Sequence, residues 1–113
     1  MEERRGSSRI PLQLQVGLLQ KKTNQQIEIL RGNINDGGIG GYTRDIVQAG
    51  NAISIRITFP QRSGEAASET ITGKTVWAHM DGNFIAFGIT FSPFDSNTYP
   101  HLNTYLQYAA QFE

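Results

Sequence analysis

The sequence predicts a mainly β protein: a small antiparallel barrel of six strands, followed by one C-terminal helix. Three observations lead to this fold class. Apolar and polar residues alternate over most of the chain, as is typical of half-buried strands. Short turn signals separate the alternating segments, and near the C-terminus the apolar spacing becomes helical. A length of 113 residues suits one domain with a single modest core.

The strands are predicted in chain order from this alternation. Segment 12–18 places Leu12, Leu14, Val16 and Leu18 on one face, and shorter patterns indicate strands over 27–29 and 39–42. Three stronger strands follow over 53–59, 70–79 and 83–91. The pair Asp81-Gly82 between the last two indicates a tight hairpin. Six short strands joined by tight turns favour a closed or barrel-like sheet.

The helix is predicted over 97–112, where apolar residues recur at helical spacing. Asn97 or Thr98 can cap it, and Pro100 suits its first turn. We therefore expect one domain over 1–113, with a flexible arginine-bearing segment over 1–11 and the barrel over 12–92.

The composition excludes several function classes. Ten basic and ten acidic residues cancel, which argues against binding of a nucleic-acid polymer. The chain has no cysteine, so disulfides and thiolate metal sites are impossible. No apolar run reaches the length of a membrane span, and the N-terminus lacks the apolar core of a secretory signal. We expect a cytoplasmic protein that does not insert into a membrane.

Enzyme chemistry has no support in the sequence. His79 and His101 are far apart and stand in no motif, and the carboxylates show no paired spacing. No glycine-rich loop continues into Lys-Ser or Lys-Thr, and potential metal ligands are sparse. We expect no catalytic residue, no metal and no cofactor.

Two stretches are candidates for a ligand site. The segment "ERRGSSRIP" carries Arg4, Arg5 and Arg9, and an extended chain would place the last two on one side, up to about 13 Å apart. Guanidinium groups match phosphate oxygens and the edge of guanine. By itself, such a segment is more often a solvated chain terminus than a ligand site.

The second candidate is "NINDGGIGGY", residues 33–42. It has more glycines than one turn requires, and bare backbone lets another group approach closely. Asn33 and Asn35 each offer an amide that both donates and accepts, as a purine edge requires. Taken alone, such a stretch is more often an ordinary turn than a ligand site.

Read together, the two stretches resemble the signature motifs of the PilZ domain, a bacterial receptor for cyclic di-GMP. The first motif, RxxxR, corresponds to Arg5-Gly-Ser-Ser-Arg9, and the second, (D/N)xSxxG, to Asn33-Ile-Asn35-Asp-Gly-Gly38. The stretches "TGKTVWA" and "IAFGITF" resemble the last two strands of the family. The likeness covers almost the whole chain and implies a six-stranded barrel with a C-terminal helix.

The resemblance also implies a ligand and its contacts. Arg5 and Arg9 would grip guanine edges and phosphates, and Arg4 implies a stacked pair of ligand molecules at one site. Asn33, Asn35, Gly37 and Gly38 would hold one guanine. Trp77 is a weaker candidate, because its indole either lines the pocket or packs on the barrel. The implied function is that of a receptor that changes its surface toward an unidentified downstream protein, with motility, biofilm or exopolysaccharide as its output.

One position departs from the family pattern and keeps a second hypothesis open. The serine of the second motif is Asn35 here, which is bulkier and lacks a hydroxyl. The alternative is therefore a PilZ-like adaptor that binds proteins without the ligand. An RNA-binding barrel ranks last, because aromatic and basic residues do not interleave on the predicted strands.

Overall fold

The computed structural model describes residues 10–61, 63–95 and 97–110. Arg4, Arg5 and Arg9 therefore lie outside the described residues. The described part contains the following elements: β1 (Ile10–Pro11), β2 (Gln15–Gln20), β3 (Gln25–Ile27), β4 (Arg31–Ile34), β5 (Gly38–Thr43), β6 (Ala52–Pro60), β7 (Ala66–Asp81), β8 (Phe84–Phe91) and α1 (Pro100–Ala110).

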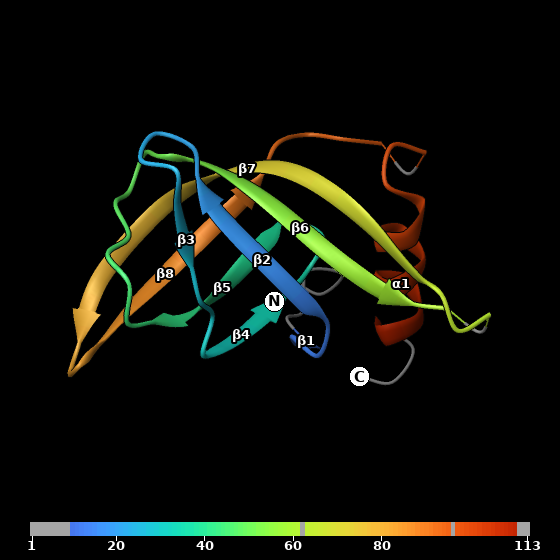
Figure 1. The fold of residues 1–113 in the computed structure, drawn as a ribbon, viewed down its shortest axis with the longest axis horizontal. Coiled ribbons are helices and arrows are strands. Elements are labelled where there is room, and N and C mark those ends of the chain that lie inside the picture. The colour runs from blue at the N-terminus through green and yellow to red at the C-terminus, as the bar shows by residue number, and fades with distance from the viewer. Residues whose placement is uncertain (1–9, 62, 96, 111–113) are drawn as a thin grey trace, which may run out of the picture.

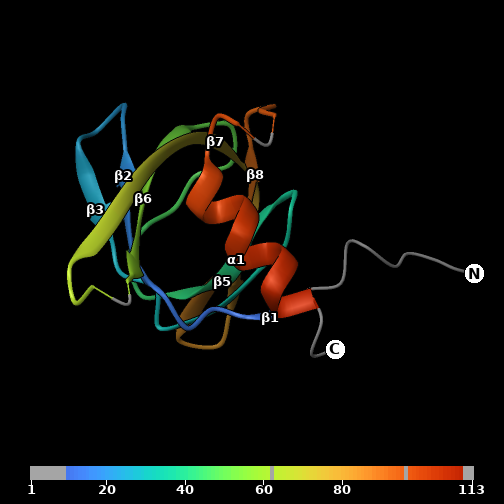
Figure 2. The same cartoon turned by 90° about the vertical axis from the view of Figure 1, so that its right-hand side faces the viewer.

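The eight strands form one antiparallel sheet in the order β1-β4-β5-β8-β7-β6-β2-β3. The sheet curls strongly, and α1 lies across one end of the curl (Figures 1 and 2). The predicted mainly β fold with a C-terminal helix is confirmed. Within the described residues the sheet is not closed, because its edges β1 and β3 are not paired with each other.

The strand count differs from the predicted six because the first two predicted strands are each interrupted. Residues 10–34 form one long bent hairpin, in which β1 pairs with β4 and β2 pairs with β3. The register changes by one residue between Ile10↔Ile34 and Leu18↔Ile27. Such an extra residue bends a strand pair. Because of the bend, the segment over residues 10–20 pairs with β4 through β1 at its start and with β6 through β2 at its end.

The core consists of aliphatic and aromatic side chains on the inner face of the curl. Cross-strand register aligns Leu18, Ile55 and Ile71 in one inner row, and all three are buried. Full burial of such a side chain stabilises the fold by roughly 1.5–3 kcal/mol. The alternation seen in the sequence is therefore the pattern that fills this core.

The helix closes one end of the curled sheet by packing and by an unusual cap. Leu102 is fully buried, and His101 stacks on Phe59 with 5.9 Å between ring centroids. The Glu69 carboxylate of β7 accepts hydrogen bonds from the backbone amides of His101 (2.8 Å) and Leu102 (3.0 Å). Burial raises the pKa of the Tyr105 hydroxyl, an effect opposed by a backbone hydrogen bond from Gln13. The helix is thus fixed both to β7 and to the segment between β1 and β2.

No helix among the described residues is long and apolar enough to cross a membrane.

Candidate functional site

A row of five residues crosses the outer face of the sheet at the second motif. Antiparallel pairing aligns Pro11 with Asn33, Asn33 with Gly40, Gly40 with Gly88, and Gly88 with Trp77. Neighbouring strands lie about 4.8 Å apart, so Asn33 and Trp77 stand about 14 Å apart across the row. The two positions between them are glycines. The indole of Trp77 lies over Gly88, so the open glycine floor is Gly40, with the Asn33 amide on one side and the indole on the other.

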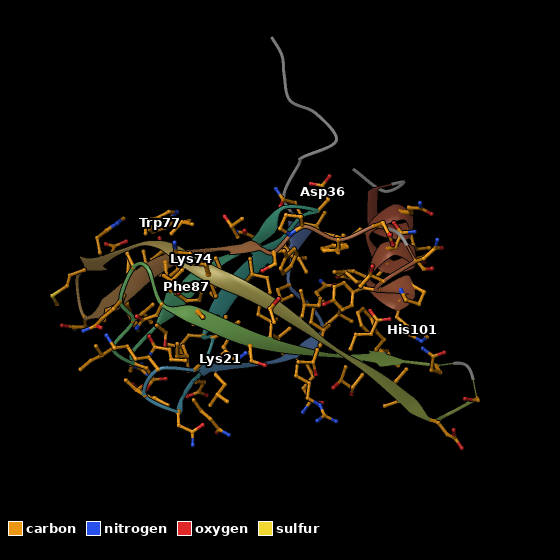
Figure 3. The ribbon with its side chains drawn as sticks, turned by 90° about the horizontal axis from the view of Figure 1, so that it is seen from above. Lys21, Asp36, Lys74, Trp77, Phe87 and His101 are labelled. Carbon is orange, nitrogen blue, oxygen red and sulfur yellow. The ribbon has the colours of Figure 1, made fainter. Side chains whose placement is uncertain are left out.

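Trp77 faces outward because of a β-bulge. Ile71, Gly73 and Thr75 all point into the core, so strict alternation would place Trp77 inside as well. The pairing of β7 with β8 slips between Thr75 and Trp77, which adds one residue to β7 and reverses the faces beyond it. Figure 3 shows Trp77 on the outside of the sheet. Its indole is 45% exposed and stacks on His79, with 5.2 Å between ring centroids.

A surface cavity of about 560 Å³ lies over this row. Asn33 and Trp77, two of the residues predicted from the sequence, line it. Arg31 and Tyr42 line it too, although the sequence analysis did not select them. A signal for Arg31 was available, because residues two apart in a strand share a face and Arg31 precedes Asn33 by two. The other lining residues are Pro11, Gly32, Gly40, Gly41, Ala86 and Phe87.

The remaining motif residues form the turn that adjoins the cavity. The side-chain oxygen of Asn35 accepts hydrogen bonds from the amides of Gly37 (2.8 Å) and Gly38 (3.1 Å). A Cβ at Gly38 would collide with the carbonyl oxygen of Ile89, so this glycine lets β5 approach β8. Asn35 and Gly38 thus shape the turn.

The turn follows the C-terminal end of β4. The first described residue, Ile10, pairs with Ile34 at this same end of the strand. In the β1–β4 ladder, Pro11 is level with Asn33 and Ile10 with Ile34. Going backward along β1 therefore leads in the direction of Asn35. The residue bonded to Ile10 on its N-terminal side is Arg9.

The charges around the cavity come from a few side chains. Arg31 lines it, and Lys74 stands on the same face of β7 as Trp77, on the other side of the bulge. Among the described residues, no carboxylate lies within ion-pair distance of Arg31, and no group of three or more potential metal ligands is found. The cavity is therefore suited to an anion with flat rings, since its lining combines a cation, an amide and aromatic side chains.

Comparison with known proteins identifies the family and agrees with the overall fold. The sequence model of the PilZ domain family matches residues 3–108. No curated protein matches the sequence. Among solved structures, the Bacillus subtilis inhibitor of motility, MotI/DgrA, is similar, with a TM-score of 0.72 and 17% sequence identity. The match covers 99% of this chain and 54% of that protein, so the chain spans about half of its length. At this identity the likeness shows the fold alone.

Proposed function

Because this chain belongs to the PilZ domain family, we propose that it is a receptor for cyclic di-GMP whose interaction surface changes when the ligand binds. PilZ domains are binding domains rather than enzymes. The proposal includes a cytoplasmic location and a downstream protein partner. It also includes regulation of motility, biofilm or exopolysaccharide as the output.

The row from Pro11 to Trp77 is the observation that carries the proposal. It places Asn33 of the second motif at one border of a glycine floor and the indole of Trp77 at the other. Cyclic di-GMP has two flat guanines and two negative phosphates. A guanine can lie on the bare backbone of Gly40, hydrogen-bond the amide of Asn33 and contact the indole, which covers Gly88.

The arginines of the first motif complete the proposed site. Arg9 directly precedes Ile10 in the sequence. Ile10 itself pairs with Ile34, inside the second motif. The described chain therefore begins beside the second motif, and Arg9 of the first motif is the preceding residue in the sequence. Arg5 and Arg9 would bind phosphates and guanine edges, with Arg4 stacking on a base.

The mechanism is an ordering of the arginine segment on the sheet. Cations bound to the phosphates of the ligand would tie this segment to the outer face, next to β4. The surface offered to a partner then differs between the free and bound forms. The structural neighbour is named as an inhibitor of motility, which supports motility as one output.

Calorimetric titration of the 113-residue chain with cyclic di-GMP tests the proposal. We expect saturable heat from the wild type and none from Arg9→Ala. Arg56→Ala is the matched control, because it removes an arginine from the outer face of β6, outside the cavity. Absence of heat and of amide chemical-shift changes at high micromolar ligand would reject cyclic di-GMP binding and favour the ligand-independent adaptor.

The adaptor hypothesis has one observation in its favour. The Asn35 oxygen, at the position of the family serine, is already an acceptor for two amides of the turn. A motif that serves only to form the turn would show the same two hydrogen bonds. The titration separates the two functions, since only the receptor requires the arginines for binding.

A further inference from the structure

A second, apolar hollow adjoins the motif cavity. It has a volume of about 320 Å³ and is lined by Leu30, Arg31, Tyr42 and Phe84. Arg31 and Tyr42 also line the cavity over the glycine row, so the two spaces meet at this pair. The hollow contains none of the residues of the two sequence motifs.

The strand register explains why the two spaces are continuous. Arg31 pairs with Tyr42, Tyr42 with Ala86, and Ala86 with His79, which forms a second row parallel to the glycine row. The two rows are two residues apart along each strand, a separation of about 7 Å. Both lie on the outer face. A ligand on the glycine floor therefore has Arg31 and Tyr42 as its next neighbours.

The hollow combines apolar walls, an aromatic ring and a cation, a lining that suits a flat ring beside a negative charge. Leu30 and Phe84 give it apolar walls, and the amide of Leu30 donates to the carbonyl of Tyr42 at 2.9 Å, which holds Leu30 against β5. Arg44 already lies over the Phe84 ring, 5.3 Å from its centroid. Tyr42 is 37% exposed. Its ring is thus available for stacking, while the guanidinium of Arg31 beside it has no carboxylate within ion-pair distance among the described residues.

The nearby acidic residues do not neutralise this cation. The Asp45 carboxylate accepts a hydrogen bond from the amide of Glu28 at 2.8 Å and contacts the Thr43 hydroxyl at 3.4 Å. Asp81 stands at the tip of the β7–β8 hairpin, opposite Phe84. The charge of Arg31 therefore remains available to an anion in the cavity.

We propose that the ligand site extends over Arg31 and Tyr42 into this hollow, where Tyr42 stacks on a second flat ring and Arg31 binds an adjoining phosphate. This inference rests on the proposed function, since it names further contacts for the same nucleotide. The second ring comes either from the other guanine of one cyclic di-GMP or from a second copy of the ligand. Both sources present the same chemistry, a purine next to a phosphate.

Calorimetry with cyclic di-GMP tests the extension through Arg31→Ala, Arg31→Lys, Tyr42→Ala and Tyr42→Phe. Loss of a charge-assisted contact predicts a dissociation constant about ten-fold higher for Arg31→Ala. Arg31→Lys should recover only part of the loss, because lysine lacks the planar fork. Tyr42→Ala should weaken binding about five-fold or more, while Tyr42→Phe keeps the ring and binds like the wild type.

Stoichiometry identifies the source of the second ring. One ligand per chain, bound more weakly by Arg31→Ala, assigns the ring to the same molecule. Two ligands per chain, reduced to one by Arg31→Ala, assign it to a second copy. Far-UV circular dichroism and thermal unfolding of each variant check that the fold is intact, with Arg56→Ala as the matched arginine control.

Two outcomes overturn the extension, and they are distinguishable. If Arg31→Ala and Tyr42→Ala bind like the wild type while Arg9→Ala does not bind, the extension is wrong and the receptor function stands. If the wild type itself gives no heat, the receptor function fails and the extension fails with it.

Discussion

The indole of Trp77 lies directly over Gly88, its cross-strand partner on β8. A Cβ built on Gly88 would collide with the indole nitrogen, so the absence of a side chain at Gly88 allows the ring its position. This contact fixes one border of the candidate site. It also makes Gly88 a position at which the smallest possible substitution changes the site.

We expect Gly88→Ala to displace Trp77 and to weaken ligand binding. The added methyl group overpacks the contact, which costs about 1–3 kcal/mol of the free energy of unfolding. Chemical denaturation and the emission maximum of the tryptophan measure both effects. Gly17→Ala is the control, because a Cβ at Gly17 meets no atom within 4 Å. A Gly88→Ala variant with wild-type stability and emission would contradict the described contact.

Tryptophan fluorescence should report ligand binding directly. Trp77 is the only tryptophan of the chain, is 45% exposed and lines the cavity. A guanine placed over the glycine floor would stack against it or shield it from water, so cyclic di-GMP should change its emission intensity. The titration should give the same dissociation constant as calorimetry and should be silent for Arg9→Ala. Calorimetric binding without any fluorescence change would place the ligand elsewhere.

Removal of the Glu69 carboxylate should destabilise the docking of α1. Glu69→Ala leaves the amides of His101 and Leu102 without their acceptor, and loss of a helix cap costs about 0.5–2 kcal/mol. The free energy of unfolding from urea denaturation measures the effect. Glu65→Ala is the control, since this exposed carboxylate lies just before β7 and accepts no such bond in the described structure. Equal stability of the two variants would show that the helix is held by packing alone.

The turn before α1 gives a pH-dependent prediction. The Thr98 hydroxyl, followed by the amides of Asn97 and Thr98, lowers the pKa of Asp95 below its ordinary value of 3.8. Because the pKa of Asp95 is lower in the folded state than in the unfolded state, its ionised form stabilises the fold when the pH is above the unfolded-state pKa. This stabilisation is lost as the pH falls through the folded-state pKa. The melting temperature of the wild type should therefore exceed that of Asp95→Ala at neutral pH.

The difference between these two melting temperatures should shrink once the pH falls below about 4. Thr98→Val removes the largest cause and should return the pKa of Asp95 toward 3.8, as followed by NMR titration of the carboxyl carbon. A difference that is independent of pH would mean that Asp95 acts through its shape and not its charge.

Substitution of Asn35 separates its role in the turn from its role toward the ligand. Asn35→Ala removes the acceptor of two amides and should lower the free energy of unfolding by about 1 kcal/mol. Asn35→Ser keeps a hydroxyl acceptor and restores the residue of the family motif. We expect it to retain most of the stability and to bind cyclic di-GMP at least as tightly as the wild type. Weaker binding by Asn35→Ser in calorimetry would assign Asn35 a ligand contact that serine cannot replace.

The sequence by itself determined the class of fold and the family. Alternation of apolar residues is a local property, so it identified the strands over 53–59, 70–79 and 83–91 and the helical spacing after them. The spacing of the two motifs is equally local, and the family match over residues 3–108 confirmed the resemblance. The second motif also predicted Asn33 as a site residue, and Asn33 lines the cavity.

The tertiary structure decided which residues meet, because strand register and bulges are set by pairing between distant segments. The bulge before Trp77 places its side chain on the outer face, although strict alternation from Ile71 would turn it inward, and the bend in residues 10–34 divided two predicted strands into four. The contact of Glu69 with a helix more than thirty residues later has no local signal. Arg31 and Tyr42 meet only through the pairing of β4 with β5, since cross-strand neighbours are fixed by hydrogen bonds between strands and not by sequence distance.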